Sequence, residues 1–230
     1  MEKILSRTRL DRRQPLREQI YGLVRGLILT GKIGPGEVID EKEIASLLKI
    51  SRTPVREAVK KLSDEHLVDV IAQSGTKASL IDPHEVEQAY LIRRALEMES
   101  AAQAASRMTD DHADALSDLL LIHARMIERK DYEEAIATDD RFHRSIAEIS
   151  DLPRLWRAVE ISKAQLDRCR YMMLPRAGEA EATLEHHREI IRALMSRDPE
   201  RARLAMGAHL DKAYATTAEV LQMEAMKKAS

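Results

Sequence analysis

The stretch Ser51-Arg52-Thr53-Pro54-Val55-Arg56-Glu57-Ala58 begins a helix that decides how the first third of this chain folds. Ser51 is a favourable N-cap, and Pro54 lies in the first turn, where its missing N–H costs little. Arg52 and Arg56 lie four residues apart, so they share one face of the helix. Apolar residues recur at helical spacing on the opposite face, namely Val55, Ala58, Val59 and Leu62. The stretch therefore predicts an amphipathic helix whose first turn presents arginine to solvent.

The segments on either side of this helix predict the other elements of a winged helix-turn-helix. Upstream, Asp40 is the expected N-cap of a short helix, with Glu43 three residues later as its capping-box partner. Downstream, two short apolar runs flank a turn at Gly75 and predict a β-hairpin. The order helix, helix, turn, helix, hairpin places this domain at residues 14–80, after a basic arm at 1–13. The expected elements are helices over 15–30, 40–48 and 52–63 and strands over 67–72 and 76–80.

Charge divides the chain in the same way. The first 80 of the 230 residues carry 15 Lys and Arg against 11 Asp and Glu, a net of +4, whereas the remainder carries 22 against 28, a net of −6. A basic front indicates a polyanionic partner, with chance unevenness as the alternative. The arm either contacts DNA or forms a solvated tail. The arm contains Arg7, Arg9, Arg12 and Arg13, and we favour a disordered, solvated tail for the whole of it.

The second part of the chain predicts a helical bundle. Asp82 and Pro83 mark its start, because Asp caps a helix and Pro suits the first turn. Loops of a few residues favour antiparallel neighbouring helices. We therefore expect a mainly α fold, in which the winged helix-turn-helix precedes an antiparallel six-helix bundle at 81–226. The six helices are expected over 83–107, 109–129, 131–149, 152–174, 178–196 and 198–225.

Cysteine content and hydropathy exclude several classes of protein. Cys169 is the only cysteine, so an internal disulfide and a multi-cysteine zinc site are excluded, and a reducing cytoplasm fits. No run of about 18 apolar residues is present, and the polar, basic start is unlike a secretory signal. We therefore expect a cytoplasmic protein that does not associate with a membrane.

The arginine face of the Ser51-capped helix predicts sequence-specific binding to double-stranded DNA. A recognition helix presents its N-terminal residues to base edges, and an Arg fork matches the O6 and N7 atoms of guanine. Arg52 and Arg56 suit this role, while Ser51 and Thr53 can donate to phosphate. A solvated helix face is the alternative for an isolated pair of arginines, but the flanking turn and hairpin favour DNA. The hairpin adds two further candidates, Gly75 and Lys77.

A carboxylate and three imidazoles predict a metal site in the bundle. Asp139 and His143 lie four residues apart on one helix, so both can reach one cation. His187 and His209 lie on two later helices and can converge on the same point. This donor set suits Zn, Ni, Mn or Fe, whereas the alternative is that these solvated side chains never meet. We interpret four other histidines as surface or capped residues, namely His66, His84, His112 and His123.

Several short strings resemble the GntR family of bacterial transcriptional regulators. In the front domain they are Pro35-Gly36, Glu41-Lys42-Glu43-Ile44-Ala45, the Ser51–Ala58 stretch and Gly75. In the second domain the strings that are similar to the FCD effector domain of FadR-type members are Leu91–Glu97, Asp139–His143, His187–Ile191 and His209-Leu210. A count of six helices resembles the VanR-type branch.

The resemblance implies a role for each candidate residue. It implies DNA contacts by Arg52, Thr53 and Arg56 with Gly75 at the tip of the wing, and Lys42 stands where an Arg often touches DNA. It implies one divalent metal ion per chain, with zinc favoured, and a small carboxylate effector beside that metal. The implied metal ligands are Asp139, His143, His187 and His209.

Arg93 has two interpretations. Glu97 follows it by four residues on a partly apolar face, so a buried ion pair would satisfy the guanidinium. The resemblance instead implies that Arg93 faces a cavity and clamps the effector carboxylate through two hydrogen bonds. The chain also departs from the family pattern at two positions, where His66 replaces a usual Gly and Asp151 replaces a usual Asn.

Together these features predict a ligand-responsive transcriptional regulator. We expect a repressor of genes for carboxylic-acid metabolism that binds a pseudo-palindromic operator as a homodimer. Two alternatives stay open, a metal-dependent hydrolase or lyase and an architectural DNA-binding protein without an effector. The sequence has no obvious nucleophile–base pair and no phosphate-binding glycine loop, so we expect no enzymatic activity.

Overall fold

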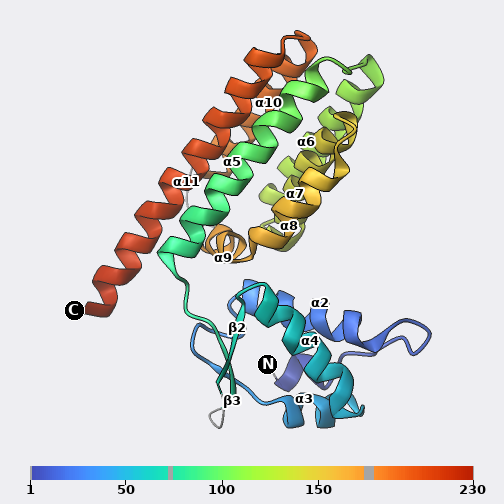
Figure 1. The fold of residues 1–230 in the computed structure, drawn as a ribbon, viewed down its shortest axis with the longest axis vertical. Helices are drawn as coiled ribbons and strands as arrows, with labels where there is room; N and C mark the ends of the chain where they lie inside the picture. Colours follow the sequence, from blue (N-terminus) through green and yellow to red (C-terminus); the bar gives the residue numbers. More distant parts are fainter. Residues whose placement is uncertain (1, 72–74, 174–178, 230) are drawn as a thin grey trace. The chain divides into compact units, whose positions relative to one another are not determined.

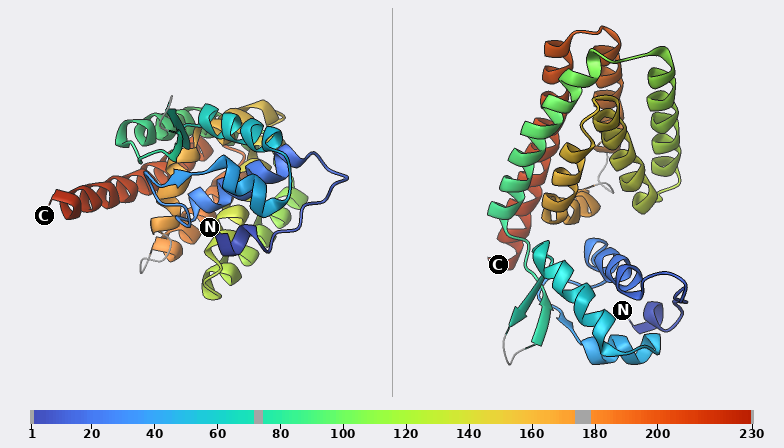
Figure 2. Two further views of the ribbon diagram at one scale, coloured as in Figure 1. Left: turned by 90° about the horizontal axis from the view of Figure 1, so that it is seen from below. Right: turned by 45° about the vertical axis from the view of Figure 1, so that its right-hand side comes forward.

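A computed structural model describes residues 2–71, 75–173 and 179–229 of the chain. It consists of two compact units, Met1–Asp82 and Pro83–Ser230. Figures 1 and 2 show that the first unit combines helices with a small sheet, whereas the described elements of the second unit are all helices.

The first unit is a winged helix-turn-helix. Its three strands form an antiparallel sheet in the order β1-β3-β2, with Val38 opposite Lys77 and Val70 opposite Thr76. This arrangement confirms the predicted fold class for the front of the chain. The elements are α1 (Glu2–Leu5), α2 (Leu16–Leu29), β1 (Val38–Ile39), α3 (Glu41–Leu48), α4 (Arg52–Asp64), β2 (Val68–Ile71) and β3 (Gly75–Ala78).

Local caps explain where α3 and α4 begin and end. The Asp40 carboxylate accepts hydrogen bonds from the N–H groups of Lys42 and Glu43, so it caps α3 as predicted. Lys49 ends α3 in the left-handed conformation. Ser51 is the extended N-cap of α4, but its side chain makes no capping bond. The core beneath these helices is formed by Ile20, Val24, Ile28, Ile44, Val55, Val59, Leu62 and Leu67.

Two features of the first unit differ from the sequence expectation. Strand β1 was not predicted, because a two-residue strand leaves no alternating pattern to detect. In the arm, Leu5 of α1 is fully buried and α1 contacts α3, so the solvated-tail interpretation is wrong for this residue. The four arginines of the arm are nevertheless exposed, namely Arg7, Arg9, Arg12 and Arg13.

The second unit is an antiparallel bundle. Helices α5 and α11 pack along each other, α6 packs on α7, and α10 packs on both α6 and α11 (Figure 1). The hydrophobic core of this unit includes Leu116, Phe142, Ile146, Ile190, Leu194 and Met206. The helices are α5 (Pro83–Ala105), α6 (Asp110–Glu128), α7 (Tyr132–Ile149), α8 (Pro153–Ser162), α9 (Ala164–Met173), α10 (Glu179–Met195) and α11 (Pro199–Ala229).

The expected helix over 152–174 is divided in two, so the described part of this unit has seven helices and the count of six is wrong. The division falls at Lys163, where the sequence holds neither Pro nor Gly. Lys163 is 2% exposed, and its amino group lies 2.7 Å from Asp140 and 2.6 Å from Asp167. The pair with Asp167 is local, but the pair with Asp140 joins α7 and is a tertiary contact, so helix periodicity gave no sign of the break. The helix count therefore no longer supports the VanR-type branch.

Both departures from the family pattern lie in left-handed backbone. His66 has φ 56° and follows α4, and Asp151 has φ 60° and follows α7. This region favours Gly strongly and Asn more than other residues, which explains why those two residues are usual there. In this chain His66 and Asp151 adopt the same conformation at a modest energetic cost.

Candidate functional site

Three buried imidazoles meet inside the second unit. His143 projects from α7, His187 from α10 and His209 from α11. All three are at most 5% exposed, and each offers a ring nitrogen within 4.8 Å of those of the other two. Because the three residues come from three helices, the bundle brings together the histidines that the sequence analysis selected.

Asp139 adds a carboxylate to the same group. It lies one turn before His143 on α7 and is 5% exposed. Its Oδ1 atom lies 3.4 Å from His187 Nε2, and its Oδ2 atom lies 3.8 Å from His143 Nε2. The four predicted metal ligands are therefore neighbours in space. We call Asp139, His143, His187 and His209 the ligand cluster.

The state of the ligand cluster suits a bound cation. Burial lowers the pKa of His187 and of His209 well below its usual value, so both imidazoles are neutral, the form that binds metal. Burial alone would raise the pKa of Asp139, but Arg170 and the neighbouring histidines lower it well below its usual value. Both ring nitrogens of His187 are buried without a hydrogen-bond partner. A metal ion would satisfy such a nitrogen, which is otherwise costly to bury.

His123 also belongs to this site, and its interpretation as a surface or capped residue is wrong. It is 2% exposed on α6, and both its ring nitrogens lack a hydrogen-bond partner. With Asp139 and His187 it forms a second group of three metal-binding side chains within 4.8 Å. The signal was present in the sequence, because Leu116, Leu120 and His123 share the apolar face of α6. Among the other histidines, His66 and His84 are exposed, and His112 is half-buried.

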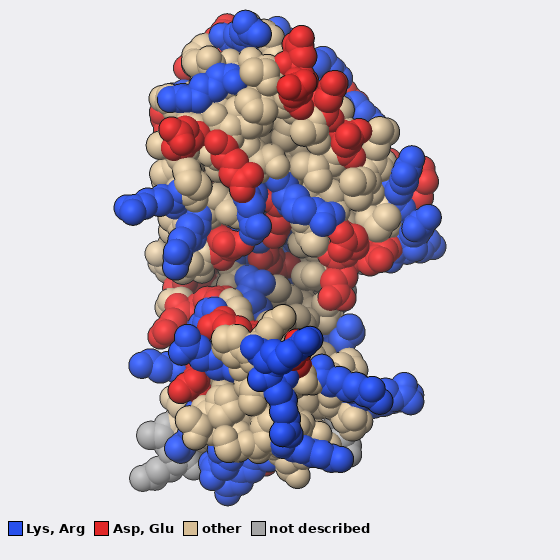
Figure 3. Space-filling view, turned by 90° about the vertical axis from the view of Figure 1, so that its right-hand side faces the viewer, with Lys and Arg blue, Asp and Glu red and all other residues tan. Residues whose placement is uncertain are grey.

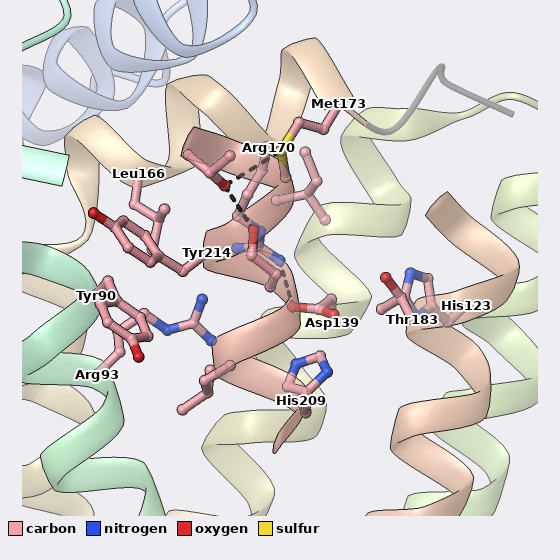
Figure 4. Close-up of a pocket in the computed structure, with 14 residues that line it drawn as sticks. Tyr90, Arg93, His123, Asp139, Leu166, Arg170, Met173, Thr183, His209 and Tyr214 are labelled. Carbon is pink, nitrogen blue, oxygen red and sulfur yellow. Dashed lines mark hydrogen bonds and ion pairs between the residues drawn. The ribbon is translucent and has the colours of Figure 1, made fainter. Parts of the chain in front are cut away.

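A cavity of about 80 Å³ lies beside the ligand cluster. Arg93 reaches it from α5, Arg170 from α9 and His123 from α6, and the side chains of Arg170 and Asp139 meet within it (Figure 4). Its apolar wall includes Ile136, Leu166, Met173 and Leu210. The site thus combines cationic groups, metal-binding groups and an apolar surface, as pockets for small acids require.

Arg93 forms the predicted ion pair with Glu97 and also faces the cavity. It is 4% exposed, and its Nε donates a hydrogen bond to Glu97 Oε1 at 2.6 Å, while the residue also lines the cavity. Glu97 Oε2 lies 2.6 Å from His143 Nδ1. Burial would raise the pKa of Glu97, but Arg93 and His143 lower it to about 2. Glu97 therefore orients the imidazole of a predicted metal ligand, a role that the sequence did not predict.

In the first unit, α4 presents the predicted DNA-binding face. Ser51, Arg52, Thr53 and Arg56 are all exposed, while the opposite face of the helix is buried. The Arg56 side chain is 70% exposed and lies 3.6 Å from Glu41. Lys and Arg dominate the visible face of this unit, whereas they mix with Asp and Glu over the second unit (Figure 3).

The wing and the start of α3 hold the remaining candidates. Gly75 begins β3 with φ 92°, a conformation that favours glycine, although an added Cβ would meet no atom within 4 Å. Lys77 is half-buried within β3, and Lys42 is exposed in the first turn of α3. All seven candidates are therefore on the surface or close to it.

Comparison with known proteins agrees with both units. The model of bacterial regulatory proteins of the gntR family matches residues 16–77, and the FCD domain model matches residues 88–212. The HTH-type transcriptional repressor RspR of Escherichia coli (strain K12) is 34% identical over 94% of each chain. This chain belongs to the GntR family. A further relative is the probable D-xylose utilization operon transcriptional repressor of Paenarthrobacter nicotinovorans, 29% identical over 86% of this chain and 87% of that one.

Solved structures show the same fold for this GntR-family chain. Escherichia coli McbR/YncC superposes with a TM-score of 0.77 at 22% identity, covering 90% of this chain and 98% of that one. A putative transcriptional regulator GntR from Rhodococcus sp. RHA1 gives 0.72 at 22% identity, covering 88% and 97%. Family and relatives identify a DNA-binding transcriptional regulator rather than an enzyme, as the sequence predicted. No helix among the described residues combines the length and apolarity needed to cross a bilayer.

Proposed function

We propose that this GntR-family regulator is a cytoplasmic repressor whose affinity for operator DNA is set by a small carboxylate bound beside one divalent metal ion. The observation that carries the proposal is that three buried imidazoles meet beside Asp139, and that Asp139 and His209 line the same cavity as Arg93. Neither an architectural DNA-binding protein nor a structural bundle needs such a cavity, so the arrangement favours a sensor.

The ligand cluster would hold the metal, with His143, His187, His209 and Asp139 as its ligands. Imidazole with carboxylate suits zinc, and also nickel, manganese or iron. When bound, the metal supplies a Lewis-acidic position that accepts a carboxylate oxygen. Arg93 would hold the same carboxylate through its guanidinium, and Glu97 would keep the His143 ring oriented. A cavity of about 150 Å³ takes up benzene, so one of about 80 Å³ favours an acid of few carbon atoms.

On the DNA side, we propose that a homodimer places two copies of α4 in successive major grooves of a pseudo-palindromic operator. Arg52 and Arg56 would read base edges, and the other candidates would contact phosphate, namely Lys42, Ser51, Thr53, Gly75 and Lys77. The name of the Paenarthrobacter relative supports control of catabolic genes. We propose genes for carboxylic-acid metabolism as the targets, because the cavity suits an acid.

The effector changes DNA affinity only through its different affinities for the DNA-bound and free conformations. Truncating a metal ligand should therefore remove both metal binding and the response to the acid, without removing the recognition helix. This separation makes the metal the first part of the proposal to test.

The test is elemental analysis of the purified protein beside its His143→Ala and His187→Ala variants. We expect about one metal ion per chain in wild type and its loss in both variants, because each removes a buried ligand. His186→Ala is the matched control, since His186 adjoins His187 but is not part of the ligand cluster, and it should keep the metal. Absence of metal from folded wild type supplied with zinc would refute the metal site. Arg93 alone would then have to explain effector binding.

A further inference from the structure

Arg170 lies in the wall of the effector cavity, although nothing in the sequence pattern singled it out. We propose that Arg170 is the resident counter-cation of Asp139, that a divalent metal ion displaces it, and that the displaced guanidinium then binds the effector anion beside Arg93. This inference rests on the proposed metal site. It assigns a second anion-binding residue and explains why metal and effector would bind together.

The contacts of Arg170 divide into two kinds. Its Nη2 atom pairs with Asp139 Oδ2, whereas its Nη1 atom lies 2.7 Å from Asp140 Oδ1 and 3.0 Å from Asp167 Oδ1. The amino group of Lys163 also forms ion pairs with Asp140, at 2.7 Å, and with Asp167, at 2.6 Å. Asp140 and Asp167 therefore keep a cation if Arg170 moves. Among the described Lys and Arg residues, Arg170 is the one within ion-pair distance of Asp139.

The position of Arg170 conflicts with a metal ion that Asp139 holds through Oδ2. The guanidinium occupies Oδ2, the oxygen of Asp139 that also lies nearest His143 Nε2, at 3.8 Å. A metal shared by Asp139 and His143 would approach the same oxygen. Two cations on one carboxylate oxygen repel strongly at low dielectric, so metal binding favours release of the guanidinium.

The released guanidinium would remain at the cavity. The Arg170 side chain is 12% exposed, and it reaches the same cavity as Arg93 from the neighbouring helix α9 (Figure 4). The ion pairs around the cavity join three cations and four carboxylates, a net charge of −1, and a divalent ion changes this to +1. Uptake of an anion offsets this excess, because buried charge is costly unless it is paired. Metal binding thus raises the affinity for the acid.

The alternative hypothesis is that Arg170 supports metal binding instead of competing with it. If Arg170 instead held Asp139 in the orientation that the metal requires, as partners of ligating carboxylates often do, its removal would weaken metal binding about 10–100-fold. Competition predicts that removal strengthens metal binding. The sign of the change therefore decides between the two roles.

The experiment titrates full-length metal-free protein with zinc in competition with a chromophoric chelator. We expect Arg170→Gln to bind zinc about tenfold or more tightly than wild type, because the metal no longer displaces an ion pair. Lys163→Gln is the control: it removes a cation from the same cluster that does not contact Asp139, and its zinc affinity should not exceed that of wild type, because Asp140 and Asp167 then depend on Arg170 alone. Circular dichroism verifies folding of each variant. Arg170→Lys, which keeps a charge near the carboxylates, provides a second variant, with an affinity between wild type and Arg170→Gln.

The outcomes separate this inference from the proposed function. Weaker or unchanged zinc binding in the Arg170 variants, with tight binding in wild type, would overturn the role of Arg170 and leave the metal site intact. Wild type that binds no zinc would overturn the metal site and this inference with it.

Discussion

Single residues with left-handed backbone end several helices of this chain. Among the described residues, five that are not glycine have a positive φ, and each follows a helix, namely Lys49, His66, Lys130, Asp151 and Arg197. At Asp151 the N–H donates to the Glu148 carbonyl and the next N–H donates to Ala147, the hydrogen bonds of a Schellman motif. Such motifs favour glycine, so these residues store strain that a substitution can release.

Asp151→Gly should stabilise the protein by about 0.5–1 kcal/mol, because glycine adopts this conformation without strain. Asp151 is exposed, so its side chain loses little packing. Urea unfolding of the two proteins measures the difference. Asp151→Ala is the control, and it should bring no gain because alanine is strained at the same φ. A stability gain in both variants would show that the carboxylate itself, rather than the backbone, was unfavourable.

At the scale of elements, helix α4 has two faces: one is buried in the core, and the other is exposed and is the predicted DNA-binding face. Its buried side chains pack on the core and hold the helix in place. This packing fixes the position of the Arg56 backbone. The side chain itself is 70% exposed and has one long contact, to Glu41 at 3.6 Å. The guanidinium is therefore available to a nucleic acid without breaking a strong internal ion pair.

Arg56→Ala should weaken binding to the specific operator by about 1–3 kcal/mol, because a base-reading fork is lost. Binding to random DNA should change much less. Fluorescence anisotropy at constant salt, with both DNA sequences, measures this ratio. Arg157→Ala, an exposed arginine of α8, controls for the loss of charge. Equal losses on operator and random DNA would instead identify Arg56 as a phosphate contact.

Over the whole molecule, buried imidazoles make stability depend on pH. The pKa values of His123, His187 and His209 are lowered by burial, whereas in the unfolded chain they return to about 6.5. Below that pH the unfolded state binds more protons than the folded state, so the free energy of unfolding falls with falling pH. Glu97, with a pKa of about 2, stays charged throughout this range and does not contribute.

The metal-free protein should therefore lose about 1 kcal/mol of stability for each of these imidazoles between about pH 7.5 and about pH 5.5. Urea unfolding at both pH values measures the loss. His187→Gln should show a smaller loss, since one buried titrating group is removed. An unchanged urea midpoint between these two pH values would contradict the conclusion that the histidines are buried and neutral.

Short-range signals in the sequence determined most of the fold and part of the site. Helical periodicity and caps such as Asp40 placed the winged helix-turn-helix, and the spacing of Asp139 and His143 put two metal-binding groups on one helix face. These features depend on residues that are close in sequence, so they can be recognised without knowledge of the tertiary packing. Resemblance to known family members then indicated His187 and His209 as their partners.

Tertiary packing decided the rest. Four features depend on contacts between helices or on the surrounding core. They are the break at Lys163, the contact between Glu97 and His143, the burial of His123 and the ion pair between Arg170 and Asp139. An isolated charged residue has the same local pattern on a solvated face as in a buried ion pair. The folded bundle removes water from these side chains. Because an unpaired buried charge is costly, specific ion pairs form there.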